Sequence, residues 1–161
     1  IIREQDELPV FRQFSYYPAF MEGWALYSEY LPKELGLYQD PYDDYGRLVL
    51  ELLRACRLVA DTGIHYKRWT YDETLKFMLS NMPITPTGAK RAVERYFATP
   101  GQATAYKVGQ LKILELRQKA QEALGDAYDV RDFHELVLTG GALPLSILEQ
   151  VVEDWISAQK K

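Results

Sequence analysis

Two glutamates in an otherwise apolar and aromatic stretch are the first residues that could do chemistry. Glu22 and Glu29 lie in the segment MEGWALYSEYL, which covers residues 21–31. Their separation corresponds to about two turns of an α-helix, so the spacing predicts that both carboxylates lie on one helix face. A buried carboxylate is destabilising unless it is paired or bound to a cation. Either this end of the helix is solvated, or Glu22 has a partner.

A second group of polar residues lies on a long apolar segment, residues 45–69. Its members recur at steps of three or four and would form one stripe on a helix: Arg47, Glu51, Arg54, Arg57, Asp61 and His65. The stripe could be a solvated face with Arg47–Glu51 and Arg57–Asp61 ion pairs. It could also be a buried network facing a cleft, in which Asp61 positions His65. We favour the network, because the rest of this segment is apolar around most of its circumference.

The histidines and the cysteine provide no complete metal site. His65 and His134 are the only histidines, and no H-E-x-x-H motif, the usual core of a zinc hydrolase, is present. A lone histidine is more often structural than a ligand. Cys56 is the only cysteine, so a disulfide within the chain is impossible. Its apolar surroundings predict a buried, unreactive thiol.

Two tyrosines flank a turn rich in polar groups. In the segment ERYFATPGQATAYKVG, Arg95 and Tyr96 lie near the end of one predicted helix, and Gln102 and Tyr106 lie on the next. Tyrosine hydroxyls at such a turn can line a pocket and donate to a developing oxyanion. They could equally be core residues with satisfied hydroxyls. The spacing alone leaves both interpretations open.

Composition excludes some classes of function. The chain has 161 residues, a formal net charge of −4 and no basic block longer than a pair, which argues against a nucleic-acid surface. No apolar run reaches the roughly 18 residues of a membrane span, and no signal peptide is visible. The length predicts a single domain, residues 1–161. The start at Ile1, without methionine, is expected of a piece cut from a longer protein, and equally of a processed or trimmed chain.

Helix signals follow one another and predict an all-α fold of about seven helices, without strands. Residues 4–14 would end an earlier helix. The expected helices cover residues 18–36 with a bend near Pro32, 45–69 capped by Asp43 or Asp44, 71–80, 86–98, 102–124, 130–140 and 144–159. Capping boxes are expected at Thr70–Glu73 and Thr99–Gln102, and single caps at Thr85 and Asp129. Gly125 is expected to end the helix at 102–124.

Several phrases, in order and in register, resemble one known family. EGWALYSEYLPKELGLYQDPYDDYGRL, RACRLVADTGIH, RYFATPGQATAYKVG, LR, FHELVL and GALPL are similar to the bacterial domain-of-unknown-function family eight-eight-five. The resemblance covers essentially the whole chain. Members of that family look like zinc metallopeptidases of the gluzincin type, with an H-E-x-x-P-G-H-H-like segment a few tens of residues before the EGWALY phrase.

The resemblance implies specific roles for residues of this chain. Glu22 would be the glutamate ligand of the zinc, and the two histidine ligands and the general base would lie upstream of Ile1. Tyr106, and after it Tyr96, would stabilise the oxyanion; His65 and His134 are weaker catalytic candidates. The supporting residues around the site would be Glu29, Arg57, Asp61, Arg95 and Gln102. The full-length protein would bind zinc and a peptide substrate, whereas this chain alone would be inactive and bind no zinc specifically.

Other functions stay open at this point. The chain could be a helical binding or scaffold domain without chemistry, or a degraded relative with an intact fold and a dead site. If it is the C-terminal part of a larger helical enzyme, an apolar patch around Trp24, Tyr27 and the inner faces of 45–69 and 102–124 would pack on the missing half. That patch could drive self-association. The bacterial compartment, cytoplasmic or exported, is not distinguished.

Overall fold

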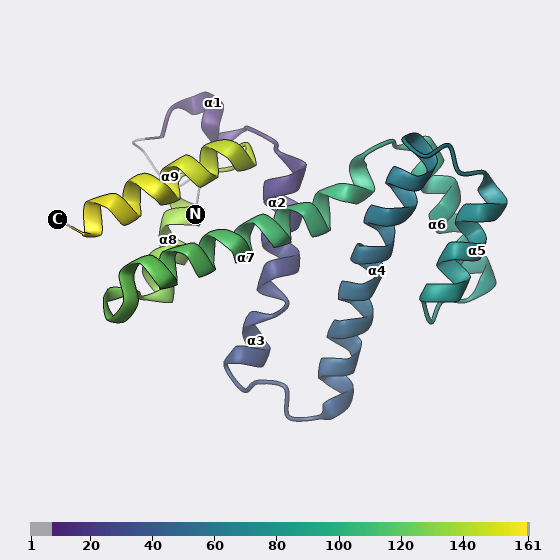
Figure 1. The fold of residues 1–161 in the computed structure, drawn as a ribbon, viewed down its shortest axis with the longest axis horizontal. Helices are drawn as coiled ribbons and strands as arrows, with labels where there is room; N and C mark the ends of the chain where they lie inside the picture. The colour runs from purple at the N-terminus through teal and green to yellow at the C-terminus, as the bar shows by residue number, and fades with distance from the viewer. Residues whose placement is uncertain (1–7, 161) are drawn as a thin grey trace. The chain divides into compact units, whose positions relative to one another are not determined.

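A computed structural model describes residues 8–160 and is all-α, with no strand in this range. Its α-helices are α1 (Val10–Gln13), α2 (Pro18–Ser28), α3 (Leu31–Glu34), α4 (Pro41–His65), α5 (Tyr71–Asn81), α6 (Pro86–Ala98), α7 (Ala105–Leu124), α8 (Val130–Thr139) and α9 (Leu145–Gln159) (Figure 1). The predicted fold class is confirmed. Of the helix expected at 4–14, residues 4–7 lie outside the described range.

The chain divides into two compact units. One contains residues 1–24 and 109–161, and the other contains residues 25–108, so the boundary falls within α2 and again within α7. The prediction of a single domain is not tested by this division and stays a prediction. No helix of the described residues is long and apolar enough to cross a membrane.

In the unit of residues 25–108, helices α4, α5 and α6 pack side by side (Figure 1). Their shared core contains Cys56, Ala60, Ile64, Met78, Met82, Ala89, Val93, Tyr96 and Ala103. Removing such side chains from water is the main favourable contribution to folding. The expectation for Cys56 is confirmed, because the thiol is buried and burial raises its pKa.

Helix α4 begins and ends at residues that differ from the prediction. Asp40 is the N-cap, accepting from the Tyr42 backbone N at 2.9 Å, whereas Asp43 and Asp44 lie in the first turn. Pro41 at the first helical position makes Asp40 the better cap. The helix ends at His65 rather than at residue 69.

The early end of α4 is explained by Gly63 and Trp69. Trp69 folds back and its backbone N donates to the Gly63 carbonyl oxygen at 2.9 Å, while Arg68 takes a positive φ of 63°. The indole packs directly on Gly63, where an added Cβ would lie 2.5 Å from Trp69 Cδ2. A side chain at position 63 would overlap the indole, so only glycine allows the tryptophan to pack here.

Three of the predicted caps are confirmed. Thr70 and Glu73 form the expected capping box at the start of α5, Thr85 caps α6, and Asp129 caps α8. Each cap satisfies a backbone N–H that has no partner within its own helix.

The prediction of a capping box formed by Thr99 and Gln102 is wrong. Gln102–Thr104 form a 3₁₀ turn before α7, its N-cap Gly101 has φ 80°, and no side chain caps it. The segment predicted as one helix over 18–36 is also broken, into α2 and α3, before the expected bend at Pro32. In α3, Pro32 instead occupies the first turn, where its missing N–H costs nothing.

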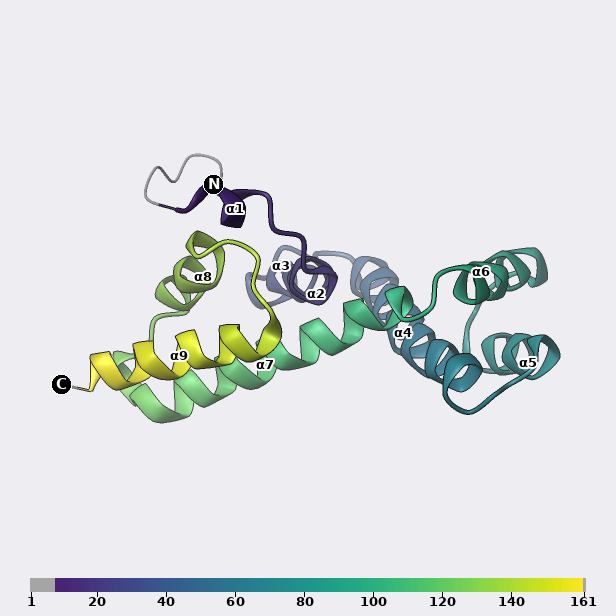
Figure 2. The same ribbon diagram turned by 90° about the horizontal axis from the view of Figure 1, so that it is seen from above.

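In the unit of residues 1–24 and 109–161, the C-terminal part of α7 lies beside α9 (Figure 2). Lys112 pairs with Glu149 at 3.5 Å, and Lys119 pairs with Glu153, so the two helices run in the same direction. The buried apolar side chains of this unit include Ile113, Leu116, Ala120, Phe133, Val137, Leu148, Val152 and Ile156.

The first part of α2 crosses α7 in the same unit through two glycines. A Cβ added to Gly23 would lie 2.5 Å from the carbonyl carbon of Gly109, and one added to Gly109 would lie 2.7 Å from the Cα of Gly23. A Cβ on Gly109 would also overlap the Ala19 carbonyl oxygen. The two backbones are therefore in direct contact, an approach that only glycine allows. Gly23 is the residue after Glu22, so this contact holds the backbone from which the Glu22 side chain extends.

The expected apolar patch is present on the predicted helices but not at its predicted centre; on α7, Val108 and Leu111 are exposed. Tyr27 is fully buried and Trp24 is half-buried, so neither forms an exposed centre. On α4, however, Tyr45, Leu48, Leu52 and Val59 are all exposed. Their steps of three, four and seven place them along one helix face. This face is the unpartnered apolar surface of α4.

Replacing Gly109 with alanine tests the glycine contact. Because the new methyl group must push two backbones apart, we expect Gly109→Ala to lower the free energy of unfolding by about 1–3 kcal/mol or more. Urea denaturation followed by circular dichroism measures the loss.

Gly46→Ala is the matched control, since Gly46 is in α4 and its Cβ would meet nothing within 4 Å. This substitution should stabilise the protein by about 0.5–1 kcal/mol. A Gly109→Ala variant as stable as the parent protein would contradict the close crossing.

Candidate functional site

Several of the polar residues predicted to carry function in the unit of residues 25–108 lie around Tyr106. The Arg57 guanidinium carbon lies 5.4 Å from the centre of the Tyr106 ring, and that of Arg54 lies 6.0 Å from it. Arg54 also donates to Glu29 Oε1 at 3.2 Å. Two guanidiniums on one aromatic ring are a cation–π arrangement that is strongest when water is excluded. We call Glu29, Arg54, Arg57, Tyr96 and Tyr106 the arginine–tyrosine cluster.

Arg57 has no carboxylate partner among the described residues. The Arg57–Asp61 ion pair of the solvated-stripe interpretation is absent there, because Asp61 turns to the segment before α7. Both of its carboxylate oxygens accept from the Gly101 backbone N, at 3.0 and 3.1 Å, and Asp61 is 2% exposed. This leaves Arg57 half-buried with its positive charge uncompensated by a neighbouring acid.

The other half of the stripe does form an ion-pair network. Arg47, 7% exposed, donates to Glu51 and to Asp44, each at 2.8 Å, and Lys107 donates to Glu51 at 2.7 Å. Burial opposes ionisation of Glu51, but the hydrogen bonds from Lys107 and Arg47 outweigh it and lower its pKa. The stripe therefore belongs to a partly buried network rather than to a freely solvated face.

Tyr96 is the buried member of the cluster. It is 1% exposed, and its hydroxyl lies beside the Arg57 guanidinium, without a hydrogen bond of good geometry to a described residue. Burial raises the pKa of Tyr96, while the nearby Arg57 and Arg95 guanidiniums oppose that rise. Arg57 Nε is likewise buried without a hydrogen-bond partner. Unpaired buried polar groups are costly, so several of them in one place are a reason to look for a ligand.

Gln102 links Arg95 to Tyr106. Its Oε1 accepts from Arg95 at 2.8 Å and its Nε2 donates to the Tyr106 hydroxyl at 3.4 Å. The predicted grouping of these three residues is therefore present. Gln102 connects the other two through its side chain, and it does not cap a helix. The bridge fixes the Tyr106 side chain at the start of α7.

The two histidines make contacts that are typical of structural residues. His65 Nε2 hydrogen-bonds with the Tyr96 carbonyl oxygen at 3.0 Å, and the ring lies edge-on to Phe97. The proposed positioning of His65 by Asp61 is wrong, since Asp61 is occupied by Gly101. In the other unit, His134 packs edge-on against Trp24, with ring centres 5.4 Å apart.

Glu22 belongs to the unit of residues 1–24 and 109–161. It is part-exposed, and no hydrogen bond or ion pair joins it to another described residue. Within residues 8–160, no three His, Cys, Asp or Glu side chains are close enough to hold a metal. Glu22 is thus an available carboxylate on a rigidly packed helix, without a ligand set around it in this range.

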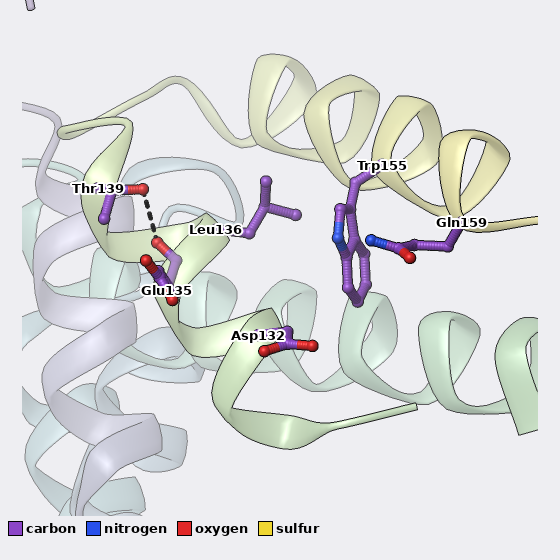
Figure 3. A pocket seen from close by; sticks show the side chains of 6 residues that line it. All are labelled: Asp132, Glu135, Leu136, Thr139, Trp155 and Gln159. Atoms are coloured by element: carbon purple, nitrogen blue, oxygen red, sulfur yellow. Dashed lines mark hydrogen bonds between the residues drawn. The ribbon is translucent and has the colours of Figure 1, made fainter. Parts of the chain in front are cut away.

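Two open pockets lie elsewhere. One, of about 290 Å³, lies between α8 and α9 and is lined by Asp132, Glu135, Leu136, Thr139, Trp155 and Gln159 (Figure 3). Its one internal hydrogen bond runs from the Thr139 hydroxyl to the Glu135 carbonyl oxygen. The other, of about 350 Å³, lies along α5 beside Trp69, and its acid, Glu73, is already used as a cap. Neither contains an unsatisfied buried polar group.

Sequence reasoning missed the roles of Arg54, Gly23 and Gly109. Arg54 was assigned only to the polar stripe, although its position three residues before Arg57 could have indicated that both share one ring. The glycine contact leaves no signal in a single sequence, because the two glycines belong to helices far apart in the chain.

Comparison with known proteins identifies the family. The model of the family described as "Bacterial protein of unknown function (DUF885)" matches residues 1–152. The chain belongs to this family. The family is the one that the sequence resembles, and its description names no activity. Comparison with curated proteins gave no match.

Two solved structures are similar to this chain. One is the "putative lipoprotein from Colwellia psychrerythraea", 47% identical with a TM-score of 0.93, matched over 96% of this chain and 27% of its own. The other, a "putative lipoprotein of unknown function from Shewanella oneidensis", is 22% identical with a TM-score of 0.78, over 92% and 27%. The second shows the fold alone. The chain spans about a quarter of the length of both proteins.

The coupling between Arg57 and Tyr96 can be tested by titration. Because the guanidinium lowers the pKa of Tyr96, Arg57→Gln should raise that pKa further above the ordinary tyrosine value of about 10. A raised folded-state pKa gives stability that is present below the unfolded pKa and lost as the pH rises through the folded one. Carbon-13 NMR of the tyrosine Cζ measures the shift.

A Tyr96→Phe variant assigns the resonance among the twelve tyrosines. Arg91→Gln, an exposed position on the same helix as Tyr96, is the matched control and should leave the pKa unchanged. A Tyr96 pKa that falls or stays constant in Arg57→Gln would contradict the assigned contact.

Proposed function

We propose that this chain is the C-terminal helical part of a zinc-dependent peptidase. In this proposal Glu22 is one metal ligand, and the arginine–tyrosine cluster serves the substrate. The observation that best supports it is Glu22 itself: a part-exposed carboxylate without a hydrogen bond among the described residues, on a helix locked by the Gly23–Gly109 contact. A carboxylate that is not engaged by another protein group is available to a metal ion.

The described residues do not complete a zinc site. A catalytic zinc takes three protein ligands and an open position for water, and residues 8–160 contain no such cluster. The remaining two ligands and the general base would come from other parts of a longer protein. Since this chain spans about a quarter of its solved relatives, such parts have room in a protein of that length.

Tyr96 and Tyr106 have the chemistry of oxyanion donors. Burial keeps Tyr96 protonated well past neutral pH, so its hydroxyl is a donor without a present acceptor. Tyr106 accepts from Gln102 and keeps its own hydrogen free to donate. These features support roles for both tyrosines, whereas the contacts of His65 and His134 give no support to a catalytic role.

A non-catalytic helical binding or scaffold domain is the alternative. It is favoured by the absence of a complete ligand cluster in residues 8–160. Either function leaves the exposed apolar face of α4 to be covered. We infer that other parts of a longer chain pack on this face, and that the isolated chain self-associates through it.

Substituting Glu22 in a family-length protein separates the two functions. We expect Glu22→Gln to reduce bound zinc and peptide hydrolysis by about 100-fold or more, because a neutral amide is a poor zinc ligand. The melting temperature of the metal-free protein should stay the same. Metal analysis, a peptidase assay and calorimetry measure the three quantities.

Glu94→Gln, at an exposed position of α6, is the control and should change none of them. A Glu22→Gln variant that keeps its zinc and activity would refute the ligand role. Loss of stability before any loss of metal would instead indicate a structural residue. The isolated 161-residue chain should show no hydrolysis.

A further inference from the structure

We propose that Arg57 and Arg54 form a binding site for a carboxylate, and that its occupant is the C-terminal carboxylate of a peptide. The choice of a peptide rests on the proposed function, whereas the carboxylate site rests on the geometry of the cluster alone.

The charge of Arg57 is the first reason for this site. A half-buried guanidinium without an acid partner is unfavourable unless other contacts replace the lost hydration. Tyr106 offers its ring face, but the π-system accepts none of the N–H bonds in the guanidinium plane. The Arg57 Nε–H remains buried and unpaired. Asp61, the acid one helical turn away, is held by Gly101 and cannot serve.

Arg54 also has a guanidinium N–H group without a hydrogen-bond partner. Its Nε is also buried without a partner, and its bond to Glu29 uses a single carboxylate oxygen, leaving Glu29 Oε2 unpaired. Arg54 and Arg57 are three residues apart on α4, so their side chains are neighbours on one face. Both lie over the same ring of Tyr106. The terminal nitrogens of Arg54 donate to the Leu50 carbonyl oxygen at 3.0 Å and to Glu29 at 3.2 Å. The site therefore presents the Arg57 guanidinium, which has no acid partner, beside an Arg54 guanidinium that is already partly used.

A carboxylate fits these donors better than other anions. An arginine fork binds the two oxygens of a carboxylate through parallel hydrogen bonds. The acids and bases of the site are three guanidiniums, Arg54, Arg57 and Arg95, and two carboxylates, Glu29 and Asp61. The site therefore has a net charge of one positive unit. A single carboxylate neutralises this charge, whereas a phosphate dianion would leave the site with a net negative charge. The side chains of Arg54 and Glu29 are 17% and 31% exposed, whereas the Nε atoms of Arg54 and Arg57 are buried, so a small ligand would approach from the exposed edge of the guanidiniums.

Arginine-detected NMR tests the site on the 161-residue chain without zinc and without turnover. The probes are acetyl-trialanine as the free acid, the same peptide as its C-terminal amide, and inorganic phosphate. We expect the free acid to shift the Arg57 and Arg54 Nε–H resonances, the amide to leave them unchanged, and phosphate to bind more weakly. Arg57→Lys should weaken binding by at least about tenfold, since lysine lacks the planar fork.

Arg91→Lys, exposed on α6, is the matched control and should bind the free acid as the parent chain does. If Arg57→Lys fails to fold by circular dichroism, Arg54→Lys provides the same test. Equal binding of acid and amide, tighter binding of phosphate, or no Arg57 shift at millimolar free acid would each overturn the proposal. None of these results depends on zinc, so a failure here is distinct from failure of the peptidase proposal.

Discussion

The backbone contact between Gly23 and Gly109 is the constraint that positions the helix segment carrying Glu22 in the unit of residues 1–24 and 109–161. Two helices cross here without any side chain between them, and an added methyl group on either glycine would meet backbone atoms. Protein interiors yield little to such overlaps. The contact fixes the position of α2, and the carboxylate of Glu22 extends from the residue next to it. The backbone that carries Glu22 is thus held in place, although its carboxylate makes no hydrogen bond to a described residue.

A second constraint operates in the unit of residues 25–108, where a buried acid organises the turn before α7. Asp61 accepts from the Gly101 backbone N with both oxygens, and Gly101 takes the positive φ that the turn requires. This segment places Gln102 between Arg95 and Tyr106. By using Asp61 in this way, the fold leaves Arg57 without an acid and presses it against Tyr106 instead. The uncompensated charge is thus a consequence of how the turn is held.

Local chemistry made much of the fold predictable. Thr70, Thr85 and Asp129 cap helices through contacts with residues two or three positions away, and their sequence signals were interpreted correctly. The prediction failed where a distant residue decides the outcome. Trp69 ends α4 by packing on Gly63. The Gln102 side chain accepts a hydrogen bond from Arg95 in the preceding helix and does not form the expected cap.

The same distinction applies to the site. Helical spacing grouped Arg57 with Asp61 and Gln102 with Tyr106, and family resemblance singled out Glu22. Spacing could not show that Asp61 turns away from both Arg57 and His65, because that depends on Gly101, forty residues later in the chain. The glycine contact at Gly109 is likewise invisible until the two helices are placed. The residues of the cluster were therefore predictable, whereas their pairing was not.

The central claim is that Glu22 ligates a catalytic zinc in the longer protein. Anomalous diffraction at the zinc edge, from crystals of a family-length protein grown with zinc, tests it most directly. The account predicts a zinc peak with a Glu22 carboxylate oxygen within about 2.2 Å. A bound zinc whose ligands do not include Glu22, or a fully zinc-supplied protein with no peak beside Glu22, would contradict it.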